Sequence, residues 1–392
     1  MLKELKYLFY TFVIFGFFYF TANYYFSDTN KKFSYRSTTL FDTKTQNYAN
    51  NLISLENDTT GIVEYPENNL DKGKKNINFG NCFLIMKNRR SFIIGVKSTK
   101  LSNNEKYFIK KYKPWGIILF SRNLKNFKQI KKLTNQIRSL FNDKKYPILI
   151  DQEGGRINRL NKLIETSTLS AEYFGNLYKK DIKKFTNYYK IYIEQMSYLL
   201  KEIGVNINTV PVLDVRRSKA NNIIGDRSYS KSSKDISKIG DFCIENFTKG
   251  KIANVIKHIP GHGLAKVDSH KKTPLVNNSK KYLYKNDFST FRNKKTLFAM
   301  TAHVIYAKID PKNTATQSPK IIKLIRNKIG FKNIIISDDI SMKALKGSLQ
   351  SNIVKTLSAG CNLVLHCNGN YNEMKIVAEN SPIIDTFILK KT

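Results

Sequence analysis

Three of the five histidines in the chain lie close together, in the segment KHIPGHGLAKVDSH that runs from Lys257 to His270. The short, apolar-leaning run 254–256 precedes this segment, which predicts that Lys257 and His258 stand where a buried strand ends. The letters IPGHG that follow are typical of a turn and cannot continue a strand. This density of imidazoles in a turn indicates a site that carries out chemistry.

Asp268 and His270, at the far end of the same segment, are two residues apart. In extended backbone their side chains would point the same way, so that the carboxylate fixes the imidazole tautomer. His270 is then a candidate general acid and base. Two other interpretations stay open at this point: a solvated loop, and a metal site formed by His258, His262 and His270, since imidazoles near a carboxylate also suit zinc.

Asp338 and Asp339 form a second candidate, directly after the apolar run 334–336. Adjacent side chains of extended backbone point in opposite directions, so we expect only one of the two carboxylates to face a pocket. That carboxylate is a candidate nucleophile. The structural alternative is that both acids stand at the start of the next helix, where they would interact with its dipole.

The elements that must position these residues follow from the pattern of the chain, which has 392 residues, 41% of them hydrophobic. Short apolar runs alternate with stretches of helical spacing, and such runs are typical of parallel strands buried on both faces. We expect strands at 83–86 with 92–96, 116–120, 148–151, 205–214, 255–258, 299–305, 334–338 and 363–367. About eight such units predict a single (β/α)₈ barrel; a doubly wound open sheet is the alternative.

Polar residues follow the carboxyl ends of several of these runs, as LFSRN (119–123), DQEGGRINR (151–159), PVLDV (211–215), KHIPGHG (257–263), MTAHV (300–304) and SDDISM (337–342). The carboxyl ends of barrel strands share one face, which carries the active site, so these residues should meet in one pocket. Asp151 or Asp214 could instead cap the next helix.

The first part of the chain differs from the rest. Residues 7–26 include no charged side chain and are long enough to span a bilayer as a helix, so we expect a hydrophobic anchor at 1–26. A polar, weakly ordered linker follows at 27–78, and the barrel occupies 79–392. The chain is therefore expected at a membrane, with the side left open; a cytoplasmic protein is the alternative.

The net charge of +37 comes from lysines scattered along the whole chain, and no recognisable nucleic-acid module accompanies them. We therefore expect no nucleic-acid partner. The four cysteines, Cys82, Cys243, Cys361 and Cys367, show no spacing of a disulfide scaffold or metal site. Cys82, Cys361 and Cys367 lie in or beside apolar runs and should be buried free thiols.

From about Phe79 to Asn370 the sequence resembles the bacterial β-N-acetylhexosaminidases of glycoside hydrolase family 3. Seven segments carry the resemblance in the expected order: DQEGGRINR, IIGDRSYS, KHIPGHG, DSH, MTAHVIY, SDDISMKAL and AGCNLVLHCN. Ile259, where the family commonly has Phe, and Asn158, where it commonly has Gln, are mild departures. Larger relatives carry a second α/β domain, for which this chain ends too soon, so the resemblance favours the single-domain branch that recycles peptidoglycan.

The resemblance implies a role for each matching residue. Asp338 would be the nucleophile, and Asp268 with His270 the acid/base dyad on a mobile loop. The sugar hydroxyl groups would be held by Asp151, Arg159, Arg227, Lys257 and His258. The implied reaction releases terminal β-linked N-acetylglucosamine from peptidoglycan fragments with retention of configuration, without a cofactor or metal and in a monomeric barrel.

Three alternatives remain beside this reading. A β-glucosidase or β-xylosidase of the same superfamily would use the same residues. A membrane-tethered muropeptide-binding protein that has lost catalysis is less compatible with both Asp338 and the pair Asp268 and His270. A metal-dependent barrel hydrolase would use His258, His262 and His270. The sequence leaves open the natural leaving group, and whether water or phosphate is the acceptor.

Overall fold

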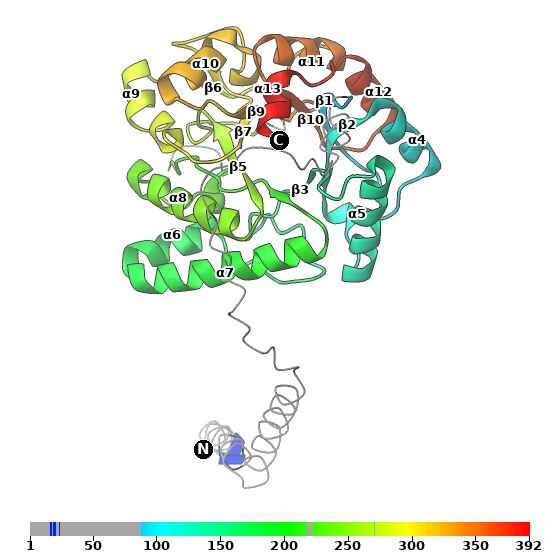
Figure 1. The fold of residues 1–392 in the computed structure, drawn as a ribbon. Coiled ribbons are helices and arrows are strands. Elements are labelled where there is room, and N and C mark those ends of the chain that lie inside the picture. The colour runs from blue at the N-terminus through cyan, green and yellow to red at the C-terminus, as the bar shows by residue number, and fades with distance from the viewer. Residues whose placement is uncertain (1–15, 18, 21–22, 24–87, 218–221, 270) are drawn as a thin grey trace, which may run out of the picture. The chain divides into compact units, whose positions relative to one another are not determined.

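The computed structural model describes residues 16–17, 19–20, 23, 88–217, 222–269 and 271–392 (Figure 1). The chain divides into two units, Met1–Lys75 and Asn76–Thr392. Nearly all of the expected anchor, the linker at 27–78 and the expected strand at 83–86 lie outside the described residues. Within the described ranges, no helix has both the length and the apolar character needed to cross a membrane. Membrane attachment therefore stays a prediction.

Eight parallel strands of the second unit close into a barrel, in the order β1-β10-β9-β7-β5-β4-β3-β2. The open-sheet alternative is therefore wrong. The barrel strands are β1 (Arg90–Gly95), β2 (Pro114–Leu119), β3 (Ile148–Ile150), β4 (Ile207–Asn208), β5 (Ala253–Ile259), β7 (Phe298–Thr301), β9 (Ile334–Asp339) and β10 (Leu363–His366). A separate two-stranded sheet pairs β6 (Leu275–Val276) with β8 (Ile305–Tyr306).

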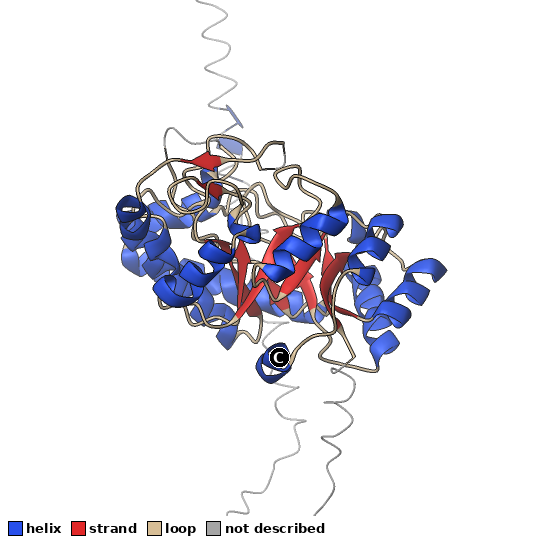
Figure 2. Cartoon of the chain, turned by 90° about the horizontal axis from the view of Figure 1, so that it is seen from above, coloured by secondary structure: helices blue, strands red, loops and turns tan. Residues whose placement is uncertain are grey.

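Helices surround the strands, as Figure 1 and the view from above in Figure 2 show. They are α4 (Asn103–Tyr112), α5 (Phe127–Phe141), α6 (Ala171–Lys180), α7 (Ile182–Glu202), α8 (Ser233–Lys249), α9 (Lys280–Lys285), α10 (Pro319–Leu324), α11 (Leu349–Ser358), α12 (Tyr371–Glu379) and α13 (Thr386–Lys391). Short helical turns are η2 (Ser121–Asn123), η3 (Gly225–Arg227), η4 (Phe288–Phe291), η5 (Ala315–Gln317) and the π-helical η6 (Ile325–Ile329).

The start of each of these α-helices is encoded locally. A Ser, Asn or Asp precedes the first helical residue and accepts a hydrogen bond from a backbone N–H of the first turn, which is otherwise without a partner. At α4, Ser102 and Glu105 form a complete capping box. Such caps fix where each helix begins, and thereby the length of the loop that connects it to the preceding element.

The strands are buried on both faces, which explains their continuous apolar sequences. In β1, Ile93 packs into the barrel interior with Trp115, Phe298 and Leu365. Its neighbours Phe92 and Ile94 belong to the larger core between the strands and the surrounding helices. A strand in this position needs apolar residues on both faces, because both are removed from water.

Two expected strands are shorter than the sequence pattern indicates. In 205–214 only Ile207–Asn208 pairs within the barrel; Pro211 has no N–H to donate, and Val212 makes an isolated bridge to Lys257. In 299–305 the barrel strand ends at Thr301, and Ile305 pairs instead with the strand β6. Both runs are apolar because they are buried, not because they continue the barrel ladder.

The contact between α6 and the segment after η3 generates a prediction about stability. A Cβ atom added at Gly175 would lie 1.6 Å from the backbone oxygen of Tyr229. Alanine is the better helix former by about 1 kcal/mol, but neither backbone can move freely, so we expect Gly175→Ala to lower the free energy of unfolding by about 2–3 kcal/mol. Urea denaturation measures this change.

Gly240→Ala in α8 is the matched control. There the added Cβ would meet the end of the Leu213 side chain, at 2.4 Å, which can rotate away more cheaply than backbone can move. We expect this variant to lose clearly less stability than Gly175→Ala. Equal losses in the two variants would contradict the assignment of the larger cost to the backbone contact.

Candidate active site

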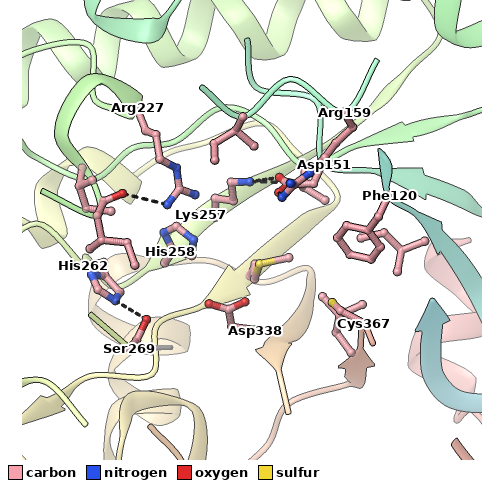
Figure 3. A pocket seen from close by; sticks show the side chains of 17 residues that line it. Phe120, Asp151, Arg159, Arg227, Lys257, His258, His262, Ser269, Asp338 and Cys367 are labelled. Atoms are coloured by element: carbon pink, nitrogen blue, oxygen red, sulfur yellow. Dashed lines mark hydrogen bonds and ion pairs between the residues drawn. The ribbon is translucent and has the colours of Figure 1, made fainter. Parts of the chain in front are cut away.

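A cavity of about 200 Å³ lies at the carboxyl ends of the barrel strands (Figure 3). Six residues expected at the site line it: Asp151, Arg159, Arg227, Lys257, His258 and Asp338. Its other lining residues are Ile118, Phe120, Ile157, Thr209, Ile223, Ile224, His262, Ser269, Met300, Leu365 and Cys367. The expectation that polar strand ends meet in one pocket is confirmed for DQEGGRINR, KHIPGHG and SDDISM; LFSRN and MTAHV contribute only Phe120 and Met300 to the lining, and PVLDV contributes no residue.

A buried lysine is the centre of one wall of this cavity. Lys257, near the end of β5, is only 2% exposed, and its ammonium contacts Asp151 and lies 2.5 Å from Glu153 Oε1. Thr209 also hydrogen-bonds both Asp151 Oδ1, at 2.6 Å, and the lysine, at 3.1 Å. An ammonium withdrawn from water is stable only when such partners surround it.

Two arginines complete the charge cluster. Arg159 donates to Asp151 Oδ2 at 2.8 Å, and Arg227 binds both oxygens of Glu153, each at 2.8 Å. We call Asp151, Glu153, Arg159, Arg227 and Lys257 the charge cluster. It joins the loop after β3, the turn η3 and the strand β5, so that side chains distant in the sequence hold one another in place.

The carboxylates of the charge cluster stay ionised. Burial alone would raise the pKa of Asp151, but the charges of Lys257, Arg159 and Arg227 together hold that pKa well below its ordinary value. Burial likewise opposes ionisation of Glu153, and Arg227 with Lys257 lowers its pKa. The cluster therefore presents a fixed set of charged donors and acceptors, which suits a neutral ligand with many hydroxyl groups.

Asp214 organises the turn after β5. It is fully buried, and its Oδ2 accepts a hydrogen bond from His258 Nδ1 at 2.6 Å while its Oδ1 accepts one from the backbone N–H of His262, also at 2.6 Å. Burial would raise the pKa of Asp214, but the hydrogen bonds and charge of His258 lower it. Nδ1 of His258 faces Asp214, so its Nε2 is the ring nitrogen that this carboxylate does not bind.

Asp338 and Asp339 lie at the end of β9 and differ in environment. Asp338 lines the cavity, and Figure 3 shows it across from Lys257 and His258. The side chain of Asp339 instead accepts hydrogen bonds from Ser341 Oγ, at 2.8 Å, and from the backbone N–H of Cys367, at 3.3 Å. The expectation that one of the pair faces a pocket is confirmed. The alternative that both start a helix is wrong, because α11 begins only at Leu349.

The pair Asp268 and His270 is only partly described, since His270 lies outside the described residues. The backbone oxygen of Asp268 accepts hydrogen bonds from the N–H groups of Lys271, at 3.0 Å, and Lys272, at 2.9 Å. The carbonyl of Asp268 thus begins a turn, and Ser269 lies in this turn rather than in the extended backbone assumed for the pair. Ser269, between the two residues in sequence, is buried and lines the cavity.

Several other expectations can be checked at the site. Asp151 binds Arg159 and Asp214 binds His258, and neither carboxylate caps a helix, so the capping alternative is wrong. His258 and His262 both line the cavity, with ring centroids 5.6 Å apart. In the described ranges, no group of three or more His, Cys, Asp or Glu side chains is arranged to hold a metal ion; His270 is outside these ranges.

The cysteines divide into two kinds. Cys243 and Cys361 are buried free thiols, as expected for Cys361, and burial raises the pKa of each to about 12. Cys367, expected to be buried, is half-buried, because its position directly after β10 places it at the cavity. Cys82 lies outside the described residues.

Sequence reasoning missed the role of Glu153 and undervalued Asp214. Glu153 lies two residues after Asp151 in DQEGGRINR, a spacing that could have placed both carboxylates on one side of extended backbone. For Asp214, the sequence offered one indication: an acidic residue at the end of the apolar run 205–214, which is too long for one short strand. Neither signal identifies the partner, which is Arg227 for one and His258 for the other.

The charge cluster generates a prediction for Lys257→Met. The substitution leaves Asp151 and Glu153 buried without their shared cation, so we expect the free energy of unfolding to fall by about 3–5 kcal/mol. Lys249→Met is the control: Lys249 pairs with Glu245 at 2.6 Å, but both side chains are more than 60% exposed, so the loss should be far smaller than that of Lys257→Met. Denaturant titration measures both values.

The same variant should change the dependence of stability on pH. Because the folded-state pKa values of Asp151 and Glu153 are lowered, their contribution is complete above the unfolded values, about 4, and is lost as the pH falls through the folded values. The difference in the free energy of unfolding between wild type and Lys257→Met should therefore become smaller below about pH 4. A difference that stays constant on acidification would contradict the electrostatic origin.

Comparison with known proteins agrees with this site. The model of the family "Glycosyl hydrolase family 3 N terminal domain" matches residues 85–386. A β-hexosaminidase of Haemophilus ducreyi is 32% identical over 287 residues, which cover 70% of this chain and 80% of that protein. The crystal structure of NagZ from Neisseria gonorrhoeae in complex with N-trifluoroacetyl-D-glucosamine superposes with a TM-score of 0.71 at 26% identity, over 77% of this chain and 88% of that one.

A family 3 β-N-acetylglucosaminidase from Paenibacillus sp. has a TM-score of 0.68 at 25% identity, over 79% of this chain and 58% of that one. The matched family range spans β1 to β10 and so includes every strand that contributes to the cavity. The resemblance seen in the sequence is thus confirmed, and the chain belongs to glycosyl hydrolase family 3, among its β-N-acetylhexosaminidases.

Proposed function

We propose that this protein is a retaining hydrolase that removes terminal β-linked N-acetylglucosamine from the non-reducing end of peptidoglycan fragments. The observation that carries the proposal is the position of Asp338, which lines the same small cavity as the charge cluster. The Asp338 carboxylate, which could attack an anomeric carbon, thus lies across the cavity from the charge cluster, whose hydrogen-bond donors and acceptors suit sugar hydroxyl groups. The cavity is small enough to hold one sugar, as expected for an enzyme that removes terminal units.

In the first step, an oxygen of Asp338 forms a bond to the anomeric carbon while the glycosidic C–O bond breaks, and His270 gives its proton to the leaving oxygen. In the second step, water attacks the same carbon, His270 takes up a proton from that water, and the bond to Asp338 breaks. Two inversions give net retention. Support for the acid/base assignment is the family resemblance, together with the position of Ser269 at the cavity.

The charge cluster would bind the sugar during both steps. A sugar hydroxyl both donates and accepts hydrogen bonds, so neighbouring carboxylate and cationic groups such as Asp151 and Arg159 can bind it from two sides. Phe120, Met300 and Leu365 provide apolar surface in the same cavity for the C–H faces of the ring. Because the cluster keeps its charges, these contacts would not depend on a proton exchange with the substrate.

The peptidoglycan assignment has a separate basis. Peptidoglycan fragments carry carboxylates on their peptide, and a chain with a net charge of +37 attracts such anions over distances of about a Debye length. The NagZ structure named above supports a sugar of the N-acetylglucosamine type in the cavity. The two arguments together favour a substrate that combines N-acetylglucosamine with an acidic remainder.

Asp338→Asn tests the nucleophile. The amide keeps the shape of the side chain but cannot form the glycosyl ester, so kcat/KM for nitrophenyl β-N-acetylglucosaminide should fall on the order of 10³-fold or more. Wild type should hydrolyse this substrate much faster than nitrophenyl β-glucoside. Release of nitrophenol by the full-length protein, with a chelator present, measures both.

Asp339→Asn is the matched control, because the substitution is the same and the residue is adjacent. Its Oδ1 remains an acceptor for Ser341 and Cys367, so we expect activity within about tenfold of wild type. Unchanged activity of Asp338→Asn would refute the nucleophile. A folded wild type inactive on both glycosides would favour a binding protein, and a preference for the glucoside would favour the β-glucosidase alternative.

The stereochemistry gives an independent prediction. A double displacement at Asp338 requires that the first sugar released has the β configuration, before it equilibrates in water. Proton nuclear magnetic resonance of the anomeric region, recorded in the first minutes of hydrolysis, distinguishes the two anomers. Initial release of the α anomer would show a single displacement and exclude a covalent intermediate.

A further inference from the structure

A hydrogen bond crosses the wall of the cavity between two residues to which the proposed mechanism gives no direct role. His262 Nε2 and Ser269 Oγ lie 3.2 Å apart, and each residue is only 3% exposed (Figure 3). His262 belongs to the turn after β5. Ser269 stands in the sequence between Asp268 and His270, the proposed acid/base pair.

His262 is firmly held on its own side. Its backbone N–H donates to Asp214 Oδ1 at 2.6 Å, and the same carboxylate binds the imidazole of His258 at 2.6 Å. One residue earlier, the backbone oxygen of Gly261 accepts a hydrogen bond from the Tyr306 hydroxyl. The backbone that carries the His262 ring is therefore held by two buried contacts, one to Asp214 after β4 and one to Tyr306 in β8.

Ser269 is held from a different direction as well. Its backbone oxygen accepts a hydrogen bond from the N–H of Ala344 at 3.1 Å, and the Ala344 oxygen accepts one from Thr273 Oγ1 at 2.7 Å. Ala344 lies in the loop that follows β9, the strand that ends with Asp338 and Asp339. Ser269 thus connects the turn after β5 with the loop after β9.

The contact with Ser269 provides the buried His262 imidazole with a hydrogen-bond partner. Burial lowers the pKa of His262 to about 4, so the imidazole is neutral near pH 7. Its Nδ1 is buried and has no hydrogen-bond partner among the described residues. A buried imidazole is costly unless it is hydrogen-bonded, and the contact to Ser269 is the one that satisfies this ring in the described part of the chain.

We propose that His262 is a positioning residue: its hydrogen bond to Ser269 holds at the cavity the residue that directly precedes the proposed acid, His270, in the sequence. The proposal rests on the proposed function of that pair as acid and base. His262 would touch neither the reacting atoms nor the leaving group. It would act through Ser269, whose displacement would move the acid away from the glycosidic oxygen.

The dependence on the leaving group tests this role. Acid catalysis matters for a methoxyphenyl N-acetylglucosaminide, whose phenol leaves poorly without a proton, and hardly for the dinitrophenyl glycoside. In the full-length protein, Ser269→Ala should lower kcat/KM for the first substrate by about 10- to 100-fold and for the second by less than about threefold. Ser269→Thr, which keeps the hydroxyl, should recover most of the loss.

Two further variants separate positioning from a general structural effect. Ser279→Ala removes a hydroxyl that caps α9, away from the cavity, and should change neither substrate's kcat/KM. His262→Gln should reproduce the leaving-group dependence of Ser269→Ala. The double variant, His262→Gln with Ser269→Ala, should have a kcat/KM no lower than that of the less active single variant, because both substitutions remove the same contact.

The outcomes distinguish this inference from the proposed function. A folded wild type that hydrolyses neither glycoside would contradict the function itself. An active wild type in which Ser269→Ala lowers kcat/KM equally for both substrates would overturn the positioning role, since a loss of folded or binding-competent protein affects all substrates alike. Additive losses in the double variant would overturn it too.

Discussion

The buried ammonium of Lys257 is the constraint on which the rest of the site depends. At 2% exposure it has lost most of its hydration, and only the carboxylates of Asp151 and Glu153 make its charge tolerable there. Each carboxylate then needs its own second cation, Arg159 for one and Arg227 for the other. One charge at the end of β5 thereby requires partners from the loop after β3 and from η3. The loops at the top of the barrel are fixed by this requirement, in addition to the packing beneath them.

A cluster of this kind contributes less to stability than its number of contacts indicates, because desolvation offsets much of the attraction between its members. Its value to the site is a fixed pattern of donors and acceptors. The lowered pKa values of Asp151 and Glu153 keep that pattern unchanged across the ordinary pH range. Asp214 does similar work beside the cluster, by holding the ring of His258 and the backbone of His262 with one carboxylate. The proton chemistry of the site is thus left to groups outside the charge cluster.

The barrel and part of its pocket could be predicted from local patterns in the sequence, whereas Arg227 was expected there only from the family resemblance. An apolar run predicts a buried strand, and a polar residue directly after it predicts the active face, as for Lys257 and Asp338. Partners could not be predicted in the same way. Asp214 and His258 are 44 residues apart, Glu153 and Arg227 are 74 apart, and Asp151 and Lys257 are 106 apart. Only the closure of the barrel brings such residues into contact, and no periodicity in the sequence records it. The turn at Asp268 was missed for a related reason. The hydrogen bonds to the Asp268 carbonyl form within a polar loop, whose sequence has no repeating pattern from which they could be predicted.

Asp338 and Asp339 show how one backbone separates chemistry from support. The alternation of β9 turns the first carboxylate to the cavity and the second away from it, where it binds Ser341 and the backbone of Cys367. Asp339 therefore ties the end of β9 to the residue after β10 and to the start of the following loop. That loop also provides the Ala344 N–H that binds Ser269. The strand that presents the proposed nucleophile and the segment that carries the proposed acid are consequently attached to the same loop. A displacement of this loop would disturb both at once, so the two steps of the proposed reaction depend on one piece of backbone.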